Sequence, residues 1–323
     1  MPTYEMGQWL LVMCHRTQQP SPDYLVAAFP TDEIREAYLS IASERAEQEV
    51  RHILRAFVGH SRSLGSFDRL QVLSIEALRK EQGREATKNG WSPRFTEYEI
   101  RALNHLSGTS STPTWEGLTW ALDLLPHAPQ KAIDVIHAYM YAHAQVLPDL
   151  RISGLTDAAE LIRTRYILQG SASIETLLEL ILNLDSRDFE YLVAHLYEVL
   201  GYDTEVTPAQ KDYGKDVIAR KINETVFIEC KNWQGHVGVK VISDLAGRVS
   251  MEQATRGIVI GTSGFTEGPA TATEIASRWP SRISLLDGIE LIKLMNQHLG
   301  SEWHRRVERI IQSERSRQDR RPK

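Results

Sequence analysis

Apolar positions in the first 170 residues recur mainly every three or four residues, which is the period of an amphipathic helix. One helix is expected to begin after Pro30, with Thr31 as its N-cap and two acidic residues in its first turn. Its apolar positions keep helical spacing, with some slippage, as far as Phe57. Further helices are predicted at residues 67–82, 95–106, 115–125, 129–145 and 155–168, the last beginning near Thr156 or Asp157, with a loop at 107–113.

The pattern changes after residues 170–173, whose glycine and small polar side chains are typical of a linker. A short helix is expected at 177–184, and Asp185 or Ser186 is expected to cap the next helix, which Gly201 ends. Helices are predicted at 187–200, 239–253, 269–277 and 288–298, and strands at 203–207, 216–220, 225–230, 257–260 and 283–286. The sequence therefore predicts an α-helical N-terminal domain followed by an α/β domain, in which helices flank a mixed sheet.

These patterns divide the chain into three segments. Residues 1–170 are predicted to form the helical domain, as a sensor, an adaptor or an oligomerisation unit, and residues 171–300 the α/β domain. The last segment, residues 301–323, is rich in arginine. We expect it to be a solvated helix that frays into a partly disordered end; the alternative is an accessory contact to phosphate.

Composition narrows the class of protein. The chain has 323 residues, 42% of them hydrophobic and 24% charged, which is typical of a soluble globular protein. The most apolar stretch, residues 9–13, is too short for a membrane span and lacks the flanks of a signal peptide, so we expect no membrane association and a cytoplasmic location. Cys14 and Cys230 fit no metal-ligand spacing, which excludes a cysteine zinc site. The net charge of −5 argues weakly against a protein that coats DNA, but not against a nuclease, which must gather carboxylates.

The predicted strand at 225–231 ends in charged residues. Alternation along it separates Val226, Ile228 and Cys230 on one face from Phe227, Glu229 and Lys231 on the other. Both faces begin apolar, which indicates a central strand that is covered on both sides. Burying a carboxylate and an ammonium there is costly unless a salt bridge or, better, a metal ion compensates for it.

Asp216 begins the preceding predicted strand, within the segment DYGKD at 212–216. If the two strands form a hairpin around 221–224, Asp216 meets Glu229 and Lys231 near one edge of the sheet, although the unequal arms leave the register open. Two carboxylates and a lysine suit phosphodiester hydrolysis. The carboxylates can hold one or two Mg²⁺ ions that polarise the phosphate and lower the pKa of an attacking water, while the lysine orients that water or stabilises charge.

A family resemblance rests on motifs spread over roughly residues 186–299. They are FE at 189–190, LGY at 200–202, VTP at 206–208, DxGxDV at 212–217, ECK at 229–231, VGV at 237–239, GIV at 257–259, TSGFT at 262–266 and LDG at 286–288. In order and spacing they resemble the Mrr family, the type IV restriction endonuclease branch of the PD-(D/E)xK nuclease superfamily. The resemblance implies a restriction-endonuclease-like fold for the α/β domain, DNA as substrate and Mg²⁺ as cofactor, for which Mn²⁺ can substitute.

Carried over residue by residue, the resemblance makes Asp216 and Glu229 the metal ligands and Lys231 the catalytic lysine. Glu190 matches an acidic position on the first helix that assists the site in many members. One departure matters, because many Mrr-like domains have glutamine where this chain has Glu229. The glutamate restores the more usual superfamily pattern and favours an active site.

Other residues offer alternative roles. Asp212 could replace Asp216 as a ligand, although a turn-forming role suits it better. Cys230 as a nucleophile is disfavoured, because its side chain points away from Glu229. Gln253 and the loop at 262–265 could contact DNA, or could be a solvated helix end and a simple turn.

Two histidines and two tryptophans of the helical half complete the candidates. His137 and His143 lie six residues apart, a spacing that does not place a metal pair on one helix face, so ordinary helix packing is expected for them. Trp115 and Trp120 are interpreted as core residues.

The functional prediction is a metal-dependent endonuclease that hydrolyses DNA, in restriction or anti-phage defence. The alternative is a non-catalytic DNA-binding or scaffold protein that retains the nuclease fold. Cutting both strands needs two active sites, so a homo-oligomer is expected. The helical domain is expected to bind an unknown ligand or protein, by analogy with other sensor–effector fusions.

Overall fold

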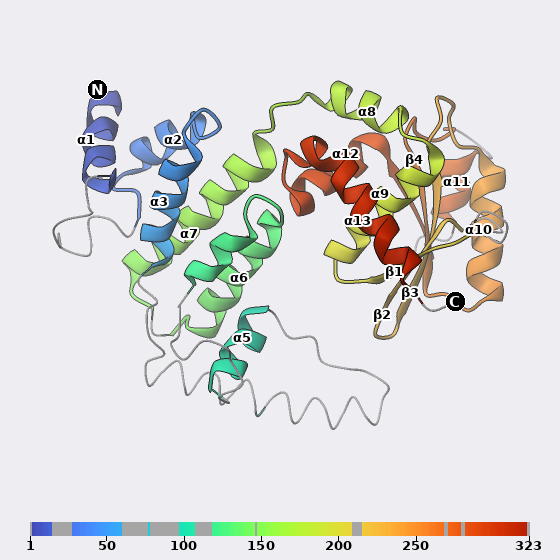
Figure 1. Cartoon of the computed structure of the whole chain (residues 1–323), viewed down its shortest axis with the longest axis horizontal. Helices are drawn as coiled ribbons and strands as arrows, with labels where there is room; N and C mark the ends of the chain where they lie inside the picture. The colour runs from blue at the N-terminus through green and yellow to red at the C-terminus, as the bar shows by residue number, and fades with distance from the viewer. Residues whose placement is uncertain are drawn as a thin grey trace. The chain divides into compact units, whose positions relative to one another are not determined.

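The computed structural model describes residues 2–14, 28–59, 77, 97–106, 118–145, 147–208, 215–267, 271–278 and 282–321. The chain divides into two compact units, residues 1–170 and residues 171–323 (Figure 1). Within the described residues, no helix combines the length and the apolar character that a membrane crossing requires.

The first unit is helical, as predicted. Its helices are α1 (Pro2–Cys14), α2 (Asp32–Ser40), α3 (Glu47–Val58), α5 (Glu97–Leu106), the 3₁₀ helix η2 (Thr119–Leu124), α6 (Pro129–Ala142), α7 (Asp149–Arg163) and the π-helical turn η3 (Thr164–Leu168). Aromatic rings cluster in its core, where the Phe29 centroid lies 5.1 Å from that of Trp9 and 5.0 Å from that of Phe57. Trp120 is buried in the same core, whereas Trp115 lies outside the described residues.

Several predicted boundaries in this unit were wrong. The run from Thr31 to Phe57 forms two helices with a turn at 41–46, and this break explains the slippage in its apolar spacing. Thr31 does cap α2, by accepting a hydrogen bond from the backbone of Ile34. Helix α7 begins at Asp149, so Asp157 lies inside it, where its carboxylate accepts a hydrogen bond from the backbone of Phe29 at 2.8 Å. The loop at 107–113, and the helix at 67–82 apart from residue 77, lie outside the described residues.

The histidines of this unit are separated as expected. His137 is exposed, whereas His143 is buried and bonds through Nδ1 to the carbonyl of Tyr139 at 2.8 Å. The two side chains therefore occupy different environments, as ordinary helix packing predicts.

The second unit contains a five-stranded mixed sheet flanked by helices, which confirms the predicted fold class. The strands are β1 (Asp203–Val206), β2 (Val217–Lys221), β3 (Glu224–Lys231), β4 (Arg256–Gly261) and β5 (Ile283–Asp287), in the spatial order β1-β2-β3-β4-β5. β1, β2 and β3 are antiparallel neighbours, whereas β3, β4 and β5 run parallel. The helices are α8 (Ile174–Leu182), α9 (Ser186–Val199), α10 (Val239–Met251), α11 (Ala272–Ser277), α12 (Gly288–Leu299), η4 (Trp303–Arg306) and α13 (Val307–Asp319).

Two apolar cores cover the two faces of this sheet. Val226 and Ile228 of β3 pack with α8, α9, α12 and α13, while Phe227 packs with α10 and α11 on the other face. Figure 1 shows the same division, with α10 and α11 on one side of the strands and α9, α12 and α13 on the other. The prediction of a central strand covered on both faces is therefore confirmed for β3.

Local signals fix the ends of α9. The Asp185 carboxylate accepts a hydrogen bond from the backbone of Asp188 at 2.8 Å, and this cap starts the helix. Gly201 follows its end with φ of 86°, a conformation that glycine adopts without a steric penalty. Both features follow the prediction from the sequence.

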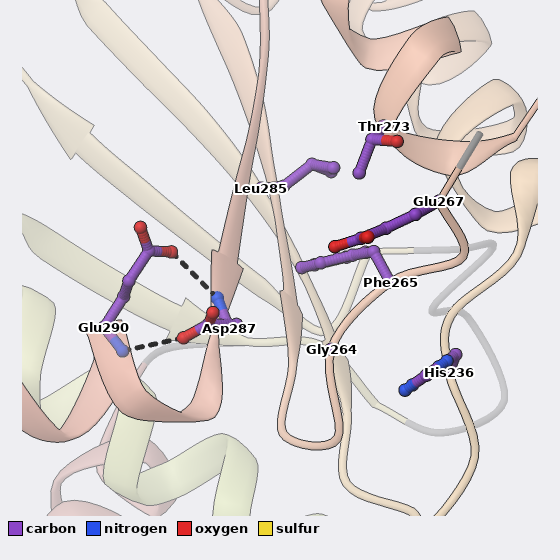
Figure 2. Close-up of a pocket in the computed structure, with 8 residues that line it drawn as sticks. All are labelled: His236, Gly264, Phe265, Glu267, Thr273, Leu285, Asp287 and Glu290. Atoms are coloured by element: carbon purple, nitrogen blue, oxygen red, sulfur yellow. Dashed lines mark hydrogen bonds between the residues drawn. The ribbon is translucent and has the colours of Figure 1, made fainter. Parts of the chain in front are cut away.

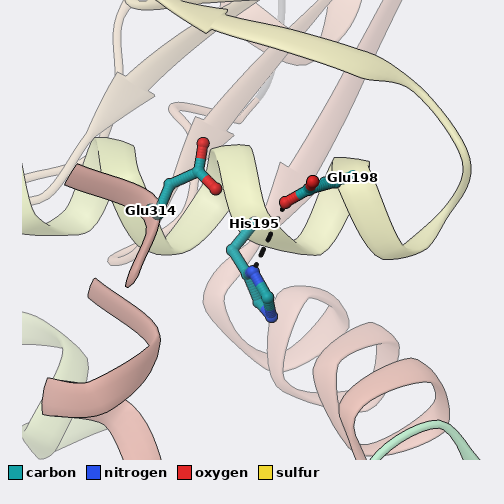
Figure 3. A group of neighbouring side chains, drawn as sticks. All are labelled: His195, Glu198 and Glu314. Carbon is teal, nitrogen blue, oxygen red and sulfur yellow. Dashed lines mark ion pairs between the residues drawn. The ribbon is translucent and has the colours of Figure 1, made fainter. Parts of the chain in front are cut away.

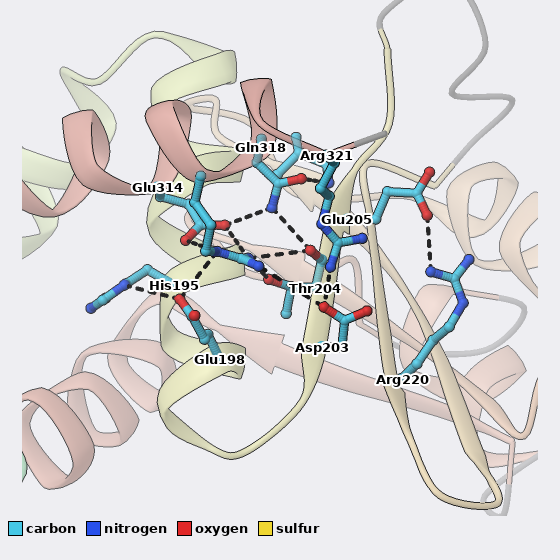
Figure 4. A network of polar contacts seen from close by, with 11 residues as sticks. His195, Glu198, Asp203, Thr204, Glu205, Arg220, Glu314, Gln318 and Arg321 are labelled. Carbon is cyan, nitrogen blue, oxygen red and sulfur yellow. Dashed lines mark hydrogen bonds and ion pairs between the residues drawn. The ribbon is translucent and has the colours of Figure 1, made fainter. Parts of the chain in front are cut away.

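The arginine-rich segment forms a helix, as expected, but this helix packs against the unit and is not fully solvated. Residues 307–319 form α13, whose Ile310 and Ile311 are buried in the same core as α9. Glu314 is also buried, and its carboxylate pairs with Arg317. The buried isoleucines attach the helix to the unit, and Figure 4 shows Glu314 and Gln318 among the polar contacts of the same helix.

Helix α13 also covers the edge strand β1. The Gln318 side chain accepts a hydrogen bond from the backbone of Val206 at 3.2 Å and donates one to the carbonyl of Thr204 at 3.0 Å. Arg317 donates to the same carbonyl at 3.2 Å. Since unpaired edge strands favour association with other chains, these side chains protect the free edge of the sheet.

Replacing Gln318 with alanine is expected to lower the free energy of unfolding by about 0.5–1.5 kcal/mol, because the backbone N–H of Val206 loses its partner while the Thr204 carbonyl keeps the hydrogen bond from Arg317. Gln312→Ala is the matched control: Gln312 is exposed on the same helix, and its loss is expected to change stability by less than about 0.5 kcal/mol. Urea denaturation of both variants measures the difference. Equal stability of the two would show that α13 does not hold the edge.

Candidate active site

The pairing of β2 with β3 brings Asp216 and Glu229 together. The β2–β3 register ends at the pair of Val217 with Ile228, and the backbone N–H of Asp216, just before β2, also donates to the carbonyl of Ile228 at 2.8 Å. The Asp216 carboxylate reaches the end of β3, where it accepts a hydrogen bond from the backbone N–H of Cys230, the residue after Glu229. Since side chains alternate along a strand, Glu229 lies on the same face of β3 as Phe227, which α10 and α11 cover.

Both carboxylates are buried and held by specific contacts. Asp216 is 7% exposed and Glu229 is 5% exposed. The backbone N–H of Cys230 donates to Oδ2 of Asp216 at 2.7 Å, and the Lys231 ammonium forms an ion pair with Oε1 of Glu229. Lys231 is itself 20% exposed in its side chain, so the ammonium lies at the solvent boundary of the carboxylate pair.

The neighbouring carboxylates determine the protonation state of the Lys231 side chain. Burial lowers the pKa of its ammonium, but the hydrogen bond to Glu229 and the charges of Glu229 and Asp216 raise it more, so the pKa lies above its ordinary value. Lys231 therefore stays protonated at neutral pH. It can donate a hydrogen bond and supply positive charge, but it is unsuited to act as a base.

Cys230 is a core residue. Its side chain lies with Ile228 in the core beneath α9, on the opposite face from Glu229. Burial, followed by the negative charges of Asp216, Glu190 and Glu229, raises the pKa of this thiol well above its ordinary value. A thiol that remains protonated is a poor nucleophile, which agrees with the interpretation from the sequence.

Glu190 approaches the centre from the other face of the sheet. It lies on α9 and forms an ion pair with Arg187 at 2.8 Å, and Arg187 also donates to the carbonyl of Thr207 at 2.6 Å. The backbone N–H of Thr207 in turn donates to the carbonyl of Asp216 at 2.9 Å. Glu190 is therefore connected to the Asp216 backbone through Arg187 and Thr207.

The loop at 262–265 supports the end of β3. The Thr262 backbone donates to the carbonyl of Lys231 at 3.1 Å, and the Ser263 hydroxyl donates to the carbonyl of Trp233 at 2.6 Å. The Trp233 side chain is 47% exposed, and its ring centroid lies 5.6 Å from the Lys231 ammonium. The sequence reasoning missed this exposed aromatic side chain, although its position two residues after Lys231 was a usable signal.

The remaining candidates from the sequence are Gln253 and Asp212. Gln253 lies just beyond α10, exposed and with φ of 56°, so it belongs to the turn that follows the helix. Asp212, the alternative ligand, lies outside the described residues.

A second group of potential metal ligands lies on the opposite face of the sheet. Ligand atoms of His195, Glu198 and Glu314, from α9 and α13, lie within 4.8 Å of one another (Figure 3). The sequence reasoning missed it because Glu314 belongs to the segment that was expected to be solvated.

A guanidinium already supplies positive charge to this second group. Arg317 lies 2.5 Å from Glu314 and 3.4 Å from Glu198, and Figure 4 shows His195, Glu198 and Glu314 within a wider polar network. Burial also lowers the pKa of His195, which favours its neutral form. These contacts are those of a structural ion-pair network.

Comparison with known proteins identifies the class of this unit. Residues 181–295 match the Mrr_cat family model, described as "Restriction endonuclease". A stretch of 132 residues is 30% identical to "Type IV methyl-directed restriction enzyme EcoKMrr" of Escherichia coli (strain K12) and covers 38% of this chain and 42% of that protein. The resemblance to the Mrr family is confirmed for this part of the chain. The unit carries a restriction endonuclease domain, and this match supports a nuclease role in restriction.

Other similar proteins add less. A stretch of 91 residues is 34% identical to "Uncharacterized protein y4cE" of Sinorhizobium fredii (strain NBRC 101917 / NGR234), covering 26% of this chain and 23% of that protein. The chain therefore matches less than half the length of either curated relative. The crystal structure titled "Protein of Unknown Function AF1548" aligns with 42% of this chain and 99% of its own, at 15% identity and a TM-score of 0.27, which is too low to support an argument.

Proposed function

We propose that this chain is a divalent-metal-dependent endonuclease that hydrolyses phosphodiester bonds in DNA. The observation that carries the proposal is the two buried carboxylates of Asp216 and Glu229 at the end of β3, with Lys231 at the solvent boundary. These residues and Glu190 all lie inside the segment that matches the restriction endonuclease family. A role in restriction or anti-phage defence follows from that family.

The donor set fits a hard cation. Asp216 and Glu229 offer carboxylate oxygens, which Mg²⁺ prefers, and Mn²⁺ accepts the same ligands. With Lys231 the group holds two negative charges and one positive charge, so a bound cation offsets the remaining repulsion. A divalent cation held there polarises the scissile phosphate and lowers the pKa of an attacking water.

The protein's own groups supply orientation and charge. The Cys230 N–H fixes the Asp216 carboxylate, and Glu229 holds the Lys231 ammonium in its protonated form. From that position Lys231 donates a hydrogen bond to a phosphate oxygen or to the attacking water and stabilises the negative charge that develops. Trp233 offers an exposed ring beside Lys231, on which a base or sugar of the DNA can pack.

We assign Glu190 a positioning role. Its carboxylate holds Arg187, which donates to Thr207, and Thr207 bonds the Asp216 backbone. This series of contacts supports the start of β2 against the end of β3. Glu190 thus acts on the centre through Asp216.

Replacing Asp216, Glu229 or Lys231 singly with alanine is expected to reduce Mg²⁺-dependent plasmid cleavage by at least about a hundredfold, because each variant removes a ligand or the stabilising charge. Lys293→Ala is the control, since Lys293 is exposed on α12 at the opposite face of the sheet. Circular dichroism checks that each variant is folded. Cleavage at the parent rate by all three variants would refute the site.

Mg²⁺ or Mn²⁺ is expected to raise the melting temperature of the parent protein, because the ion binds the folded form and relieves the repulsion between Asp216 and Glu229. Glu229→Gln is expected to show a smaller rise. Two control variants remove an acid elsewhere: Glu308→Gln at an exposed position on α13, and Glu314→Gln in the His195 network. An undiminished shift in Glu229→Gln, or a shift lost only in Glu314→Gln, would place the ion elsewhere.

We also propose that residues 1–170 act as a sensor or adaptor that regulates the nuclease unit, and that two copies assemble to cut both strands. Each unit has its own apolar core, and the proposed catalytic residues all lie after residue 170.

A fragment from Ala172 to the end of the chain is expected to fold and to retain metal-dependent cleavage with less regulation, because it contains every proposed catalytic residue. Circular dichroism and a plasmid-nicking assay, with the full chain alongside, test this expectation. A folded, Mg²⁺-binding but inert fragment would show that the helical unit contributes to the site or to an obligatory dimer.

A further inference from the structure

A pocket of about 540 Å³ opens on the second unit, beside α11. Figure 2 shows its walls: Phe265, Leu285 and Thr273 on one side, with the polar side chains of His236, Glu267 and Asp287 around them. Its volume lies within the range of ligand sites, roughly 300–1,000 Å³. The mechanism proposed above does not use it.

The strand register places this pocket on the same face of the sheet as Glu229. Glu229 pairs with Val259, which pairs with Leu285, so Leu285 lies in the same cross-strand row. The next row on this face joins Lys231, Gly261 and Asp287 in the same way. Neighbouring strands lie about 4.8 Å apart, so the pocket begins about 10 Å from the catalytic strand.

The wall of the pocket is tied to the end of that strand. Val237, in the loop after β3, pairs with Phe265, and its N–H donates to the carbonyl of Gly264 at 2.9 Å. Gly261 leaves the space for this contact, since a Cβ there would lie 2.8 Å from Val237 and 3.2 Å from Phe265. Lys231 and the pocket therefore belong to one packed edge of the sheet.

The lining favours a base over a phosphate. Glu267, Asp287 and Glu290 carry negative charge that repels the DNA backbone. Asp287 and Glu290 bond each other's backbone in the capping box of α12, whereas the Glu267 carboxylate points into the pocket beside Phe265 (Figure 2). A carboxylate accepts hydrogen bonds from the exocyclic amino group of cytosine, and an aromatic ring stacks on the base.

We propose that this pocket receives one unpaired nucleobase with an exocyclic amino group, cytosine or adenine, from the DNA at the active site. The ring of Phe265 stacks on the base and Glu267 accepts its amino group. A distance of about 10 Å corresponds to about three nucleotides along one strand, so the base lies within that distance of the scissile phosphate. The inference rests on the proposed nuclease function and adds to it a preference for the base near the cut.

The test measures binding of the full chain to fluorescent duplexes in Ca²⁺, separately from cleavage. Three duplexes share one sequence: one is fully paired, one carries a single cytosine opposite an abasic site, and one carries thymine there. The parent is expected to bind the cytosine duplex about tenfold more tightly than the other two, because the base is already unpaired and thymine lacks the amino group.

Glu267→Ala is expected to remove the preference for cytosine over thymine while leaving binding of the paired duplex unchanged. Phe265→Leu is expected to remove the gain for the unpaired base, because it keeps apolar volume but loses the ring. Glu308→Ala, at an exposed position on α13, is the matched control and is expected to keep the preference.

Equal or absent binding of the three duplexes by the parent overturns the inference, as does a preference that survives in Glu267→Ala. A Mg²⁺-induced rise in melting temperature that Glu267→Ala abolishes also overturns it, because the pocket would then hold a cation. If the parent protein cuts plasmid DNA but shows no preference for the unpaired cytosine, the proposal for the pocket is refuted and the nuclease proposal is not. A parent that shows the preference but never cuts refutes the nuclease proposal alone.

Discussion

The antiparallel register between β2 and β3 is the constraint on which the site depends. Asp216 directly precedes β2 and Glu229 lies on β3, and the pairing of Val217 with Ile228 brings the Asp216 carboxylate to the backbone N–H of Cys230, the residue after Glu229. A slip of one residue would turn Glu229 toward the opposite core, since the side-chain period of a strand is two. The two cores prevent this slip, because Phe227 must pack under α10 while Ile228 packs under α9.

Burial makes it energetically costly to bring these two carboxylates together. Two carboxylates within an apolar core are costly, and the surrounding contacts reduce that cost only in part. The Cys230 N–H and the Lys231 ammonium each satisfy one carboxylate, and Lys231 remains at the solvent boundary. The group of His195, Glu198 and Glu314 differs from this pair of carboxylates, because the Arg317 guanidinium already pairs with Glu198 and Glu314 and offsets their negative charge. Similar ligand types on the two faces of one sheet are thus suited to different roles.

Much of the fold of this unit could be predicted, because helix caps, a terminating glycine and the alternation of side chains along a strand can be seen in short stretches of sequence. Asp185 and Gly201 mark the ends of α9 in the sequence itself, and alternation in β3 identifies which residues share a face. The register could not be predicted, because hairpin arms of unequal length leave it open and packing on both faces decides it. The order of α13 was missed because Ile310 and Ile311 are surrounded by arginines whose partners lie far away in the sequence. The pocket beside α11 was missed for the same reason, since its lining comes from several separate segments.

Diffraction from crystals of the protein grown with Mn²⁺ tests the central claim most directly, because anomalous scattering locates the ion without reference to activity. We expect an anomalous peak beside the carboxylates of Asp216 and Glu229, at roughly 2.0–2.6 Å from an oxygen of each. A peak among His195, Glu198 and Glu314, or full Mn²⁺ occupancy at any position away from Asp216 and Glu229, would contradict it.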